Sequence, residues 1–488
     1  MLKLDNNSLI RDQAYIDGEW RGARTGARFA VRNPATHEVI TEVADLDEQD
    51  VREAIEAADR AFATWRSKTA KERAAILRKW YDLMMASQED LAQLMTAEQG
   101  KPLAESRGEI AYGASFIEWF AEEGKRIYGD VIPTNAHGRR IIVVKEPIGV
   151  VGAVTPWNFP NAMITRKVGP ALAAGCTVVV KPAQLTPLSA LALAELAHRA
   201  GLPKGVFNVV PSTKSSRVGK ELTTNPLVKK FSFTGSTEVG KQLMAQCAST
   251  VKKVSLELGG NAPFIVFDDA DLDAAVKGAI LSKFRNMGQT CVCANRFLVQ
   301  DGVYDAFAEK LKKAVAALKV GDGAAAGVEQ GPLINMAAVE KVESLIADGV
   351  KHGARIELGG KRHNLGGTFF EPTILRDATP EMAFAREEIF GPVVTLFRFA
   401  KDEDAIRMAN DTEYGLAAYF YARDVGRIFK VLEGLQYGIV GVNEGIISTE
   451  VAPFGGMKES GIGREGSKYG IDDFVQIKYV AMGGLGIP

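Results

Sequence analysis

The feature that most constrains this chain is a regular alternation of short β-branched runs with helical segments beyond about residue 125. A first series of such runs lies at residues 150–155, 177–180, 207–210, 230–234 and 264–267. The clearest intervening helix begins at Thr186-Pro187, a capping residue followed by a proline suited to the first turn, and ends at Gly201. Strand and helix in alternation are typical of parallel βαβ units, so the sequence predicts an α/β fold.

A second alternating series predicts a second α/β domain, with the border near residue 260. Its strands are expected at residues 296–300, 355–358, 393–399, 417–421 and 439–443. A helical stretch that begins after Asp47 and continues to about residue 125 precedes the first series. The chain therefore has the length and the pattern of two large α/β domains.

Two segments fall outside both series. Residues 126–147 alternate in the manner of a hairpin around residues 135–138, and residues 461–488 contain a lone strand at 473–480. Unpaired strand edges are prone to association, so these strands need partners. We expect the two segments to form an oligomerisation element and the chain to be a homodimer or homotetramer.

The composition excludes several classes of protein. With 59 lysines and arginines against 60 acids and no basic stripe, nucleic acid is not an expected partner. Four cysteines in 488 residues indicate a reducing compartment, and folding should need neither a disulfide nor a metal. The first twenty residues lack an apolar signal core, and the uncharged stretch 147–165 contains three prolines. We therefore expect a cytoplasmic protein that does not enter a membrane.

A glycine-rich turn at residues 233–242 admits three interpretations. Gly235, Gly240 and Lys241 match a P-loop, but Gln242 stands where that motif has a magnesium-binding hydroxyl. The turn could instead serve only the packing of helix against strand. In the third interpretation, the N-terminus of a helix faces the pyrophosphate of a dinucleotide through its backbone N–H groups.

Three further residues are candidates for catalysis. Cys291 lies in a glycine-containing loop, as a nucleophile would, although a cysteine is more often a small buried hydrophobe. The five histidines are scattered, so a carboxylate would have to act as base. Glu257, between two leucines at the end of a strand-like run, is the candidate because desolvation raises a carboxyl pKa. Asn158, between two prolines, could donate to an oxyanion or merely satisfy its own backbone.

A second thiol lies two residues beyond the candidate nucleophile. Cys293 could trap an oxidised Cys291 as a disulfide and so inactivate the protein reversibly. The alternative is a small residue with only a packing role in the loop.

These elements, in this order, resemble the aldehyde dehydrogenase superfamily. Further matches are Lys181-Pro182-Ala183 and residues 387–392 and 453–461, so the resemblance covers nearly the whole chain. It implies two Rossmann-like α/β domains with a small β oligomerisation element. On this basis residues 1–125 and 148–259 form a dinucleotide-binding domain, 260–460 a catalytic domain, and 126–147 with 461–488 the oligomerisation element.

The resemblance also implies roles. Cys291 attacks the aldehyde to give a thiohemiacetal, Asn158 and the Cys291 N–H hold the oxyanion, hydride passes to a nicotinamide, and Glu257 activates the water that hydrolyses the thioester. No metal is implied. The cofactor-binding positions implied by the family are Thr155, Trp157, Lys181, Ala183, Gln184, Ser212, Gly235, Ser236, Glu257, Glu388 and Phe390.

We expect NADP⁺ in preference to NAD⁺, with NAD⁺ as an alternative. NAD-preferring relatives commonly carry an acid at the position of Gln184, where its charge repels a 2′-phosphate. The uncharged Gln184 leaves Lys181 free to pair with that phosphate, and Lys214 and Arg217 follow nearby. Ser212 departs from the glycine that is usual there.

Within the superfamily, residues 163–167, 283–286, 290–293 and 445–448 are most similar to bacterial-type succinate-semialdehyde dehydrogenases. The similarity assigns Arg166, Arg285 and Ser448 to the distal carboxylate of the substrate, which guanidinium groups bind bidentately. Glutarate semialdehyde, or a broader range of carboxylated aldehydes, is the alternative, because one methylene changes binding by only ~1–3 kcal/mol. Two readings outside the enzyme class are a crystallin-like binding role on this scaffold and a P-loop nucleotide switch.

Overall fold

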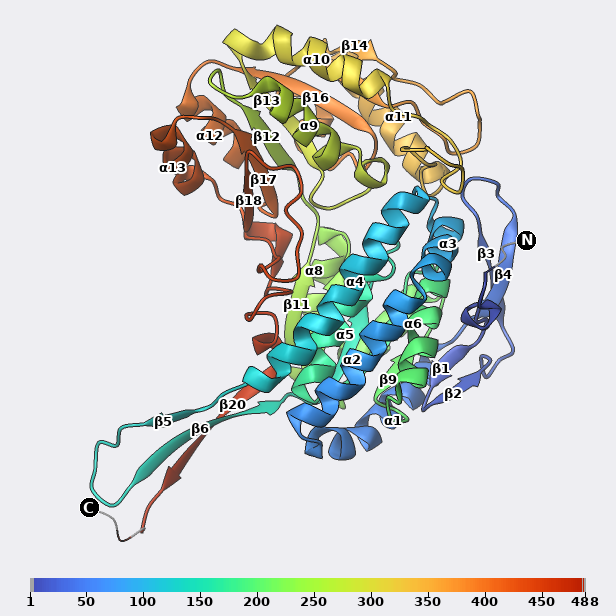
Figure 1. Cartoon of the computed structure of the whole chain (residues 1–488), viewed down its shortest axis with the longest axis vertical. Coiled ribbons are helices and arrows are strands. Elements are labelled where there is room, and N and C mark those ends of the chain that lie inside the picture. The colour runs from blue at the N-terminus through green and yellow to red at the C-terminus, as the bar shows by residue number, and fades with distance from the viewer. Residues whose placement is uncertain (1–3, 485, 487–488) are drawn as a thin grey trace.

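The computed structural model describes residues 4–484 and 486, which form two lobes, each built on a largely parallel sheet (Figure 1). A narrow three-stranded sheet extends from the first lobe away from the second (Figure 1). The predicted α/β class and the Rossmann-like alternation are thereby confirmed.

The first lobe contains an eight-stranded sheet. Its five central strands are parallel, and antiparallel strands lie at both edges. In spatial order the strands are β19 (Gly461–Ile462), β11 (Lys253–Glu257), β10 (Val228–Thr234), β7 (Val150–Val154), β8 (Thr177–Lys181), β9 (Phe207–Val209), β1 (Ala14–Ile16) and β2 (Glu19–Arg21). The central strands are those predicted from the sequence, whereas the short N-terminal strands β1 and β2 were not predicted.

The second lobe contains a seven-stranded sheet in which only the β14 pairing is antiparallel. In spatial order its strands are β14 (Arg355–Leu358), β15 (Thr373–Ala378), β16 (Val393–Phe399), β13 (Ala294–Gln300), β12 (Ala262–Val266), β17 (Ala417–Tyr421) and β18 (Ile439–Val442). The run predicted at 264–267 is therefore the β12 strand of this sheet and not a member of the first one. β15 was missed because Arg376 and Asp377 interrupt its apolar run.

Thirteen α-helices cover the two sheets in the described part of the chain. Those of the first lobe are α1 (Glu48–Ser67), α2 (Ala70–Ala86), α3 (Gln88–Gln99), α4 (Leu103–Glu123), α5 (Ala162–Ala174), α6 (Pro187–Ala200), α7 (Ser215–Thr224) and α8 (Thr237–Cys247). Those of the second lobe are α9 (Leu272–Lys283), α10 (Tyr304–Ala316), α11 (Met336–Lys351), α12 (Asp402–Asn410) and α13 (Val425–Gly434). None of these helices combines the length and apolarity needed to cross a membrane.

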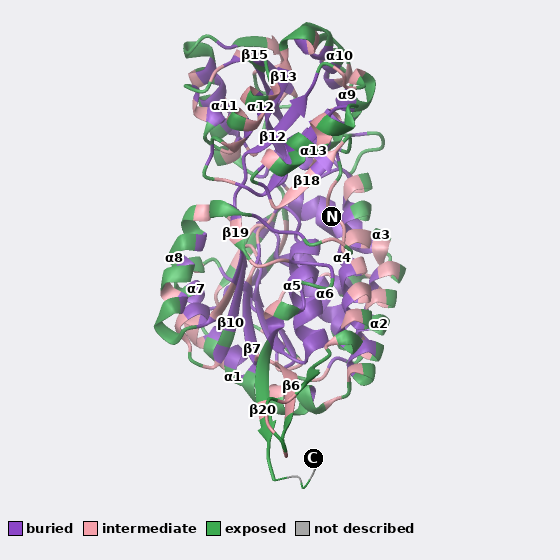
Figure 2. Cartoon of the chain, turned by 90° about the vertical axis from the view of Figure 1, so that its left-hand side faces the viewer, coloured by how far each residue is buried: buried purple, intermediate pink, exposed green. Residues whose placement is uncertain are grey.

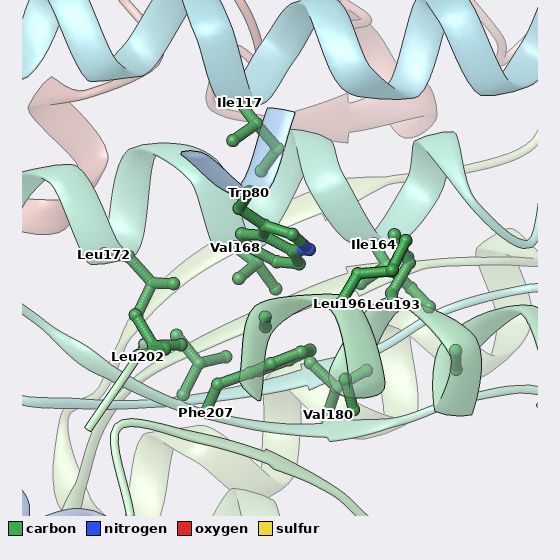
Figure 3. Close-up of a cluster of buried hydrophobic side chains, with 14 of the residues drawn as sticks. Trp80, Ile117, Ile164, Val168, Leu172, Val180, Leu193, Leu196, Leu202 and Phe207 are labelled. Atoms are coloured by element: carbon green, nitrogen blue, oxygen red, sulfur yellow. The ribbon is translucent and has the colours of Figure 1, made fainter. Parts of the chain in front are cut away.

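Helices α2, α4, α5 and α6 pack into the main core of the first lobe. Trp80 of α2 lies among Val168 of α5, Leu193 of α6 and Phe207 of β9, with the Trp80 and Phe207 ring centroids 5.6 Å apart (Figure 3). Every residue of α5 is buried, so this helix is fixed on all sides. Because α5 begins directly after the loop that carries Asn158, it also anchors one end of that loop.

The parallel strands of the first sheet end in register at the edge that faces the second lobe. Thr234 of β10 is paired with Glu257 of β11, and Val154 of β7 with Lys181 of β8. In a doubly wound sheet, ligands bind beyond the carboxyl ends of such strands. The residues that follow these strand ends are those singled out from the sequence.

The two segments predicted as lone strands pair with each other. β20 (Val475–Met482) is antiparallel to β6 (Arg140–Pro147), and β5 (Asp130–Ile132) pairs with the other edge of β6. This sheet is largely exposed, with Val131 at 77% and Ile477 at 72% (Figure 2). The expected border at residue 461 needs correction, because β19 pairs with β11 and so belongs to the first sheet. A separate hairpin joins β3 (Arg28–Arg32) and β4 (Val39–Ala44).

Candidate active site

A cavity of 270 Å³ at the junction of the lobes brings together residues that are far apart in the sequence. The loops after β7, β10 and β11 contribute to it from the first lobe, and the segments around residues 291 and 389 from the second. The predicted site residues that line it are Trp157, Asn158, Gly235, Ser236, Cys291, Glu388 and Phe390. The structure thus brings seven of the seventeen predicted site residues into one cavity.

Cys291 follows a strained turn that begins with the 3₁₀ helix η4 (Arg285–Gly288). Asn286 and Met287 have φ values of 51° and 55°, a region that non-glycine residues rarely occupy and that is often found at functional sites. A Cβ on Gly260 would lie 2.6 Å from the Cys291 carbonyl oxygen, so only glycine allows the β11–β12 loop to approach this closely. Burial and the Glu388 carboxylate raise the pKa of the Cys291 thiol to about 12. The thiol is therefore protonated at neutral pH and must lose its proton during attack.

Asn158 is held against the loop of Cys291. Its side-chain nitrogen Nδ2 donates to the backbone oxygen of Gln289 at 3.0 Å, and Asn158 itself is 4% exposed. A primary amide has two N–H donors, so one remains available for an oxyanion beside Cys291. The alternative interpretation, in which Asn158 merely satisfies its own backbone, is wrong, because its partner belongs to the other lobe.

Glu257 ends β11 and is buried with neither carboxylate oxygen hydrogen-bonded to a described residue. A Cβ on Gly455 would lie 2.7 Å from the Gly463 carbonyl oxygen and 3.0 Å from Glu257 Oε1, so glycine allows this segment to pack closely beside the carboxyl group. Burial and the neighbouring carboxylate of Glu465 raise the pKa of Glu257 well above its ordinary value. An unengaged carboxyl with a raised pKa is suited to act as a general base near neutral pH.

The cavity also has the features expected of a dinucleotide site. Ser236 is the N-cap of α8, whose first turn opens toward the cavity, and the Trp157 and Phe390 rings lie edge to face at 5.7 Å. Glu388 Oε1 accepts a 3.4 Å hydrogen bond from Gly260 N, and burial raises the pKa of Glu388 to about 7. Lys341 of α11, which sequence reasoning missed, lines the same cavity.

Of the residues predicted to bind the adenosine part of the cofactor, some have free hydrogen-bonding groups and others already have partners in the protein. Lys181 is buried, the Pro182 carbonyl at 3.0 Å is the only hydrogen-bond acceptor of its Nζ among the described residues, and burial lowers its pKa to about 8. Thr155 N donates to the Lys181 carbonyl, and the Thr155 hydroxyl is buried without a partner. An ammonium and a hydroxyl with this much free hydrogen-bonding capacity suit a phosphorylated ribose. Ala183 follows directly and is half-buried.

Three neighbours of Lys181 are engaged elsewhere. The Ser212 hydroxyl donates to the Leu46 carbonyl at 2.7 Å, so it is a structural cap in this conformation. Lys214 and Arg217, expected to add positive charge for a 2′-phosphate, form ion pairs with Asp45 and Glu48. Gln184 is exposed and lines a second cavity, of 240 Å³, instead of the one at Cys291.

The three predicted carboxylate ligands differ in their surroundings. The Arg166 guanidinium lies 3.9 Å from the Phe454 ring centroid and pairs with Glu465, with Nε 2.7 Å from Oε2, while its Nη2 is buried without a partner. Arg285 is half-buried over the ring of Phe159 at 4.9 Å. Ser448 follows β18, and the adjacent Ile447 packs against the same apolar cluster as Cys291.

Besides Lys341, two functional candidates were missed from the sequence. Tyr112 of α4 packs against Phe159 and Met163, and its hydroxyl is buried without a partner. Glu465 pairs with both Arg166 and Lys167, and although burial favours its neutral form, these cations hold its pKa below the ordinary value. Tyr112 could have been found only as a polar tip on an apolar helix face, and Glu465 carried no local signal.

The Cys293 side chain is buried in the loop beyond Cys291. Its thiol donates to the Lys283 carbonyl at 3.0 Å, and it is 7% exposed. Burial raises its pKa to about 11, so it is a poor nucleophile in this conformation. All four cysteines are free thiols. The disulfide with Cys291 therefore stays a prediction.

The profile described as the aldehyde dehydrogenase family matches residues 20–480. The chain is 64% identical over 482 residues to the succinate-semialdehyde dehydrogenase [NADP(+)] of Escherichia coli, covering 99% of this chain and 100% of the relative. It is 63% identical to a glutarate-semialdehyde dehydrogenase of Pseudomonas aeruginosa, with the same coverage. The crystal structure of a Burkholderia pseudomallei succinate-semialdehyde dehydrogenase matches with a TM-score of 0.98 and 63% identity, covering 99% and 100% of the two chains.

Proposed function

This chain belongs to the aldehyde dehydrogenase family, and we propose that it oxidises succinate semialdehyde to succinate with NADP⁺. The observation that carries the proposal is the junction cavity, which places Cys291 beside Asn158 and opposite a dinucleotide-binding edge. The succinate-semialdehyde and glutarate-semialdehyde relatives above are both named for aldehydes that carry a distal carboxylate.

In the first half of the reaction, the Cys291 sulfur attacks the aldehyde carbon and forms a thiohemiacetal. The thiol proton has to leave, because a pKa of about 12 keeps it bound at neutral pH. Glu257, whose carboxylate has no other partner, is the acceptor we assign. The developing oxyanion receives the free N–H of the Asn158 amide and the Cys291 backbone N–H.

NADP⁺, when bound, supplies the acceptor for the hydride that leaves the substrate carbon. Before the second half of the reaction, Glu257 has to pass the thiol proton to solvent. It then takes a proton from water, which attacks the thioester carbon; the C–S bond breaks, and the acid and the Cys291 thiolate are released. The raised pKa of Glu257 suits both proton transfers, because a stronger base accepts a proton more readily. We assign Glu388 and Lys341 to the binding of the ribose that carries the nicotinamide, and Ser236 to the binding of the pyrophosphate. The reason is that these three residues line the same cavity.

We assign the distal carboxylate of the substrate to Arg166, Arg285 and Ser448, with the Tyr112 hydroxyl as a fourth donor. The support is the set of unused donors: Arg166 Nη2 and the Tyr112 hydroxyl are both buried without partners. The Tyr112 ring and Arg285 both contact Phe159, which follows Asn158 directly. Buried donors of this kind favour a ligand that brings an anion.

Assembly through the three-stranded sheet is also part of the proposal. β5 and β20 leave two strand edges open, and the sheet exposes Val131, Ile477 and Tyr479. Covering such edges with a second copy of the chain removes both unpaired backbone groups and apolar surface. We propose a homodimer or homotetramer built on this sheet.

The decisive test is steady-state kinetics with matched substrates and cofactors. We expect the highest kcat/KM with succinate semialdehyde and NADP⁺, and lower values with NAD⁺ and with an uncharged aldehyde such as butanal. A higher kcat/KM with glutarate semialdehyde would identify this five-carbon homologue as the substrate. It is the second candidate because of the similarity to the Pseudomonas aeruginosa relative. A preference for butanal would refute the carboxylate site.

A further inference from the structure

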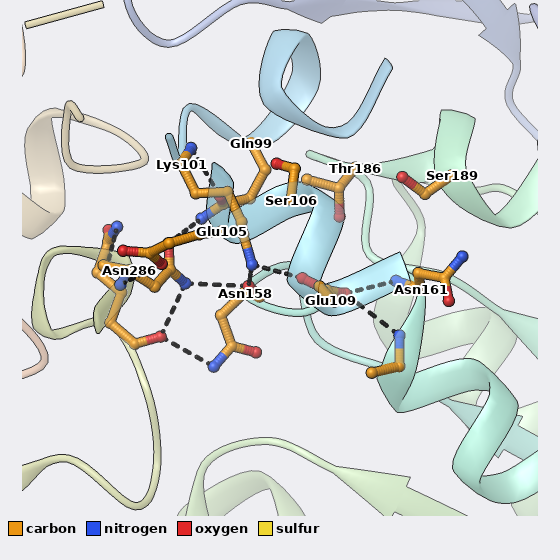
Figure 4. Close-up of polar contacts among 12 residues, drawn as sticks. Gln99, Lys101, Glu105, Ser106, Glu109, Asn158, Asn161, Thr186, Ser189 and Asn286 are labelled. Atoms are coloured by element: carbon orange, nitrogen blue, oxygen red, sulfur yellow. Dashed lines mark hydrogen bonds and ion pairs between the residues drawn. The ribbon is translucent and has the colours of Figure 1, made fainter. Parts of the chain in front are cut away.

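A wholly buried ion pair lies behind the oxyanion loop. The side chains of Lys101, just after α3, and Glu109 of α4 are both 0% exposed, with Nζ 2.5 Å from Oε2 (Figure 4). Ion pairs of this kind give little net stability, because desolvation offsets the attraction. A role other than stability is therefore to be sought in the contacts that Lys101 and Glu109 make with other residues.

Lys101 contacts the oxyanion loop at two consecutive residues. Its Nζ donates to the backbone oxygen of Asn158 at 2.7 Å and lies 3.9 Å from the ring centroid of Phe159. The Asn158 peptide is thus fixed by a charge-assisted hydrogen bond in a buried place, where such bonds are strong. The ammonium thus contacts Glu109, the Asn158 backbone oxygen and the Phe159 ring at the same time.

Glu109 holds the other end of the same loop. Its Oε1 accepts hydrogen bonds from the backbone N–H groups of Asn161 at 2.9 Å and Ala162 at 3.2 Å, at the start of α5 (Figure 4). Asn161, the N-cap of α5, makes no capping bond with its own side chain, so Glu109 supplies the cap. A Cβ on Gly113 would lie 2.0 Å from Asn161 Oδ1, so α4 approaches the loop closely only because this residue is glycine.

The pair also connects to the second lobe through Asn286. Asn286 Nδ2 donates to the same Asn158 oxygen at 3.0 Å, and its Oδ1 accepts from Gln99 Nε2 at 2.9 Å (Figure 4). Glu105 accepts from Asn286 N at 2.7 Å. Gln99, Lys101 and Glu105, around the junction of α3 and α4, thus contact both the Asn158 loop and the turn before Cys291. These contacts fix the two segments with respect to each other.

We propose that Lys101 and Glu109 are positioning residues that hold the Asn158 amide in the geometry needed for the oxyanion at Cys291. The inference rests on the proposed function, since it requires a reaction through Cys291. Neither residue touches the cavity, so both act through Asn158. Catalysis by a preorganised donor depends on placement to within a fraction of an ångström, so loss of the pair should impair the donor without removing it.

The test is a double-mutant cycle between Lys101→Met and Asn158→Ala. Asn158→Ala should lower kcat/KM about 10²–10³-fold, as expected for a lost oxyanion donor. Lys101→Met should lower it about 10–100-fold in the wild-type background and no more than about twofold in the Asn158→Ala background, because the residue it positions is gone. Equal losses in both backgrounds would overturn the proposal, since they indicate a structural effect.

Glu109→Gln serves as the second variant. It retains an acceptor for the α5 N–H groups and removes the anion opposite Lys101, so a loss of about tenfold with the same non-additivity is expected. Lys230→Met is the matched control, because Lys230 is another fully buried lysine of this lobe and bonds Ser255 at a distance from the loop. A comparable loss in Lys230→Met would contradict the proposal.

The cycle is measured with succinate semialdehyde and with butanal. Poor oxidation of succinate semialdehyde by the wild-type protein would refute the proposed substrate, while the cycle with butanal still reports on Asn158. NADP⁺ affinity, measured by fluorescence titration, should stay within about twofold in all variants. A large change in affinity that tracks the loss of rate would refute positioning through Asn158.

Discussion

Replacing Arg285 by methionine separates substrate binding from a structural role, because Arg285 is the least constrained of the proposed carboxylate ligands. Its guanidinium lies 4.9 Å from the Phe159 ring centroid, and its charge, together with that of Lys101, acts against the rise that burial causes in the pKa of Glu105. Methionine retains the apolar stem, so the cation–π contact, worth about 0.5–1 kcal/mol, is the main loss in the folded state. The melting temperature should therefore change little.

The effect on catalysis should be larger and specific to one substrate. Loss of a charge-assisted hydrogen bond costs about 1.5–3 kcal/mol, which lowers kcat/KM for succinate semialdehyde about ten- to hundredfold. For butanal, which has the same chain length and no carboxylate, kcat/KM should change less than about threefold. NADPH absorbance measures both rates. An equal loss on the two aldehydes would refute the assignment of Arg285 to the substrate carboxylate.

Three other predictions address the base, the second thiol and the assembly. Burial and Glu465 raise the pKa of Glu257 well above the ordinary carboxyl value. As the pH drops through this raised pKa, kcat should fall, because the protonated acid cannot act as base. A kcat that stays constant down to the ordinary carboxyl pKa would contradict this prediction. Dithiothreitol should restore activity to peroxide-treated wild-type protein but not to Cys293→Ala, and equal recovery would exclude the Cys291–Cys293 disulfide. Ile477→Asp, placed on the exposed face of β20, should lower the mass found by light scattering, and an unchanged assembly would place the interface elsewhere.

The predicted fold followed from the strands that are buried on both faces. β7 and β8 are continuous apolar runs, since both sheet faces are covered by helices, and their pattern is visible without the structure. β15 was missed because two charged residues lie in a largely buried strand, where Arg376 pairs with Asp305 and Asp377 pairs with Arg355. Short strands such as β1 and β2 have too few residues to show a period.

The candidate site was predictable where it depends on loops with unusual composition. The proline-rich loop of Asn158 and the glycine-containing loop of Cys291 stand out in the sequence, and the structure brings them to one cavity. Lys101 and Glu109 did not stand out, because a lysine and a glutamate on helical segments are typical of a solvated face. Only the packing of α4 against α5 reveals that both are buried.

The central claim is that oxidation proceeds through a covalent acyl intermediate on Cys291 that Glu257 helps to hydrolyse. The most direct measurement is mass spectrometry of acid-quenched Glu257→Gln protein after prolonged mixing with succinate semialdehyde and NADP⁺ at alkaline pH, because this variant also lacks the proposed acceptor of the thiol proton and solvent hydroxide has to remove it. The account predicts a succinyl adduct on the peptide that contains Cys291, formed together with one equivalent of NADPH per site and absent from Cys291→Ala. Formation of NADPH without an adduct on Cys291, or by the Cys291→Ala variant, would contradict it.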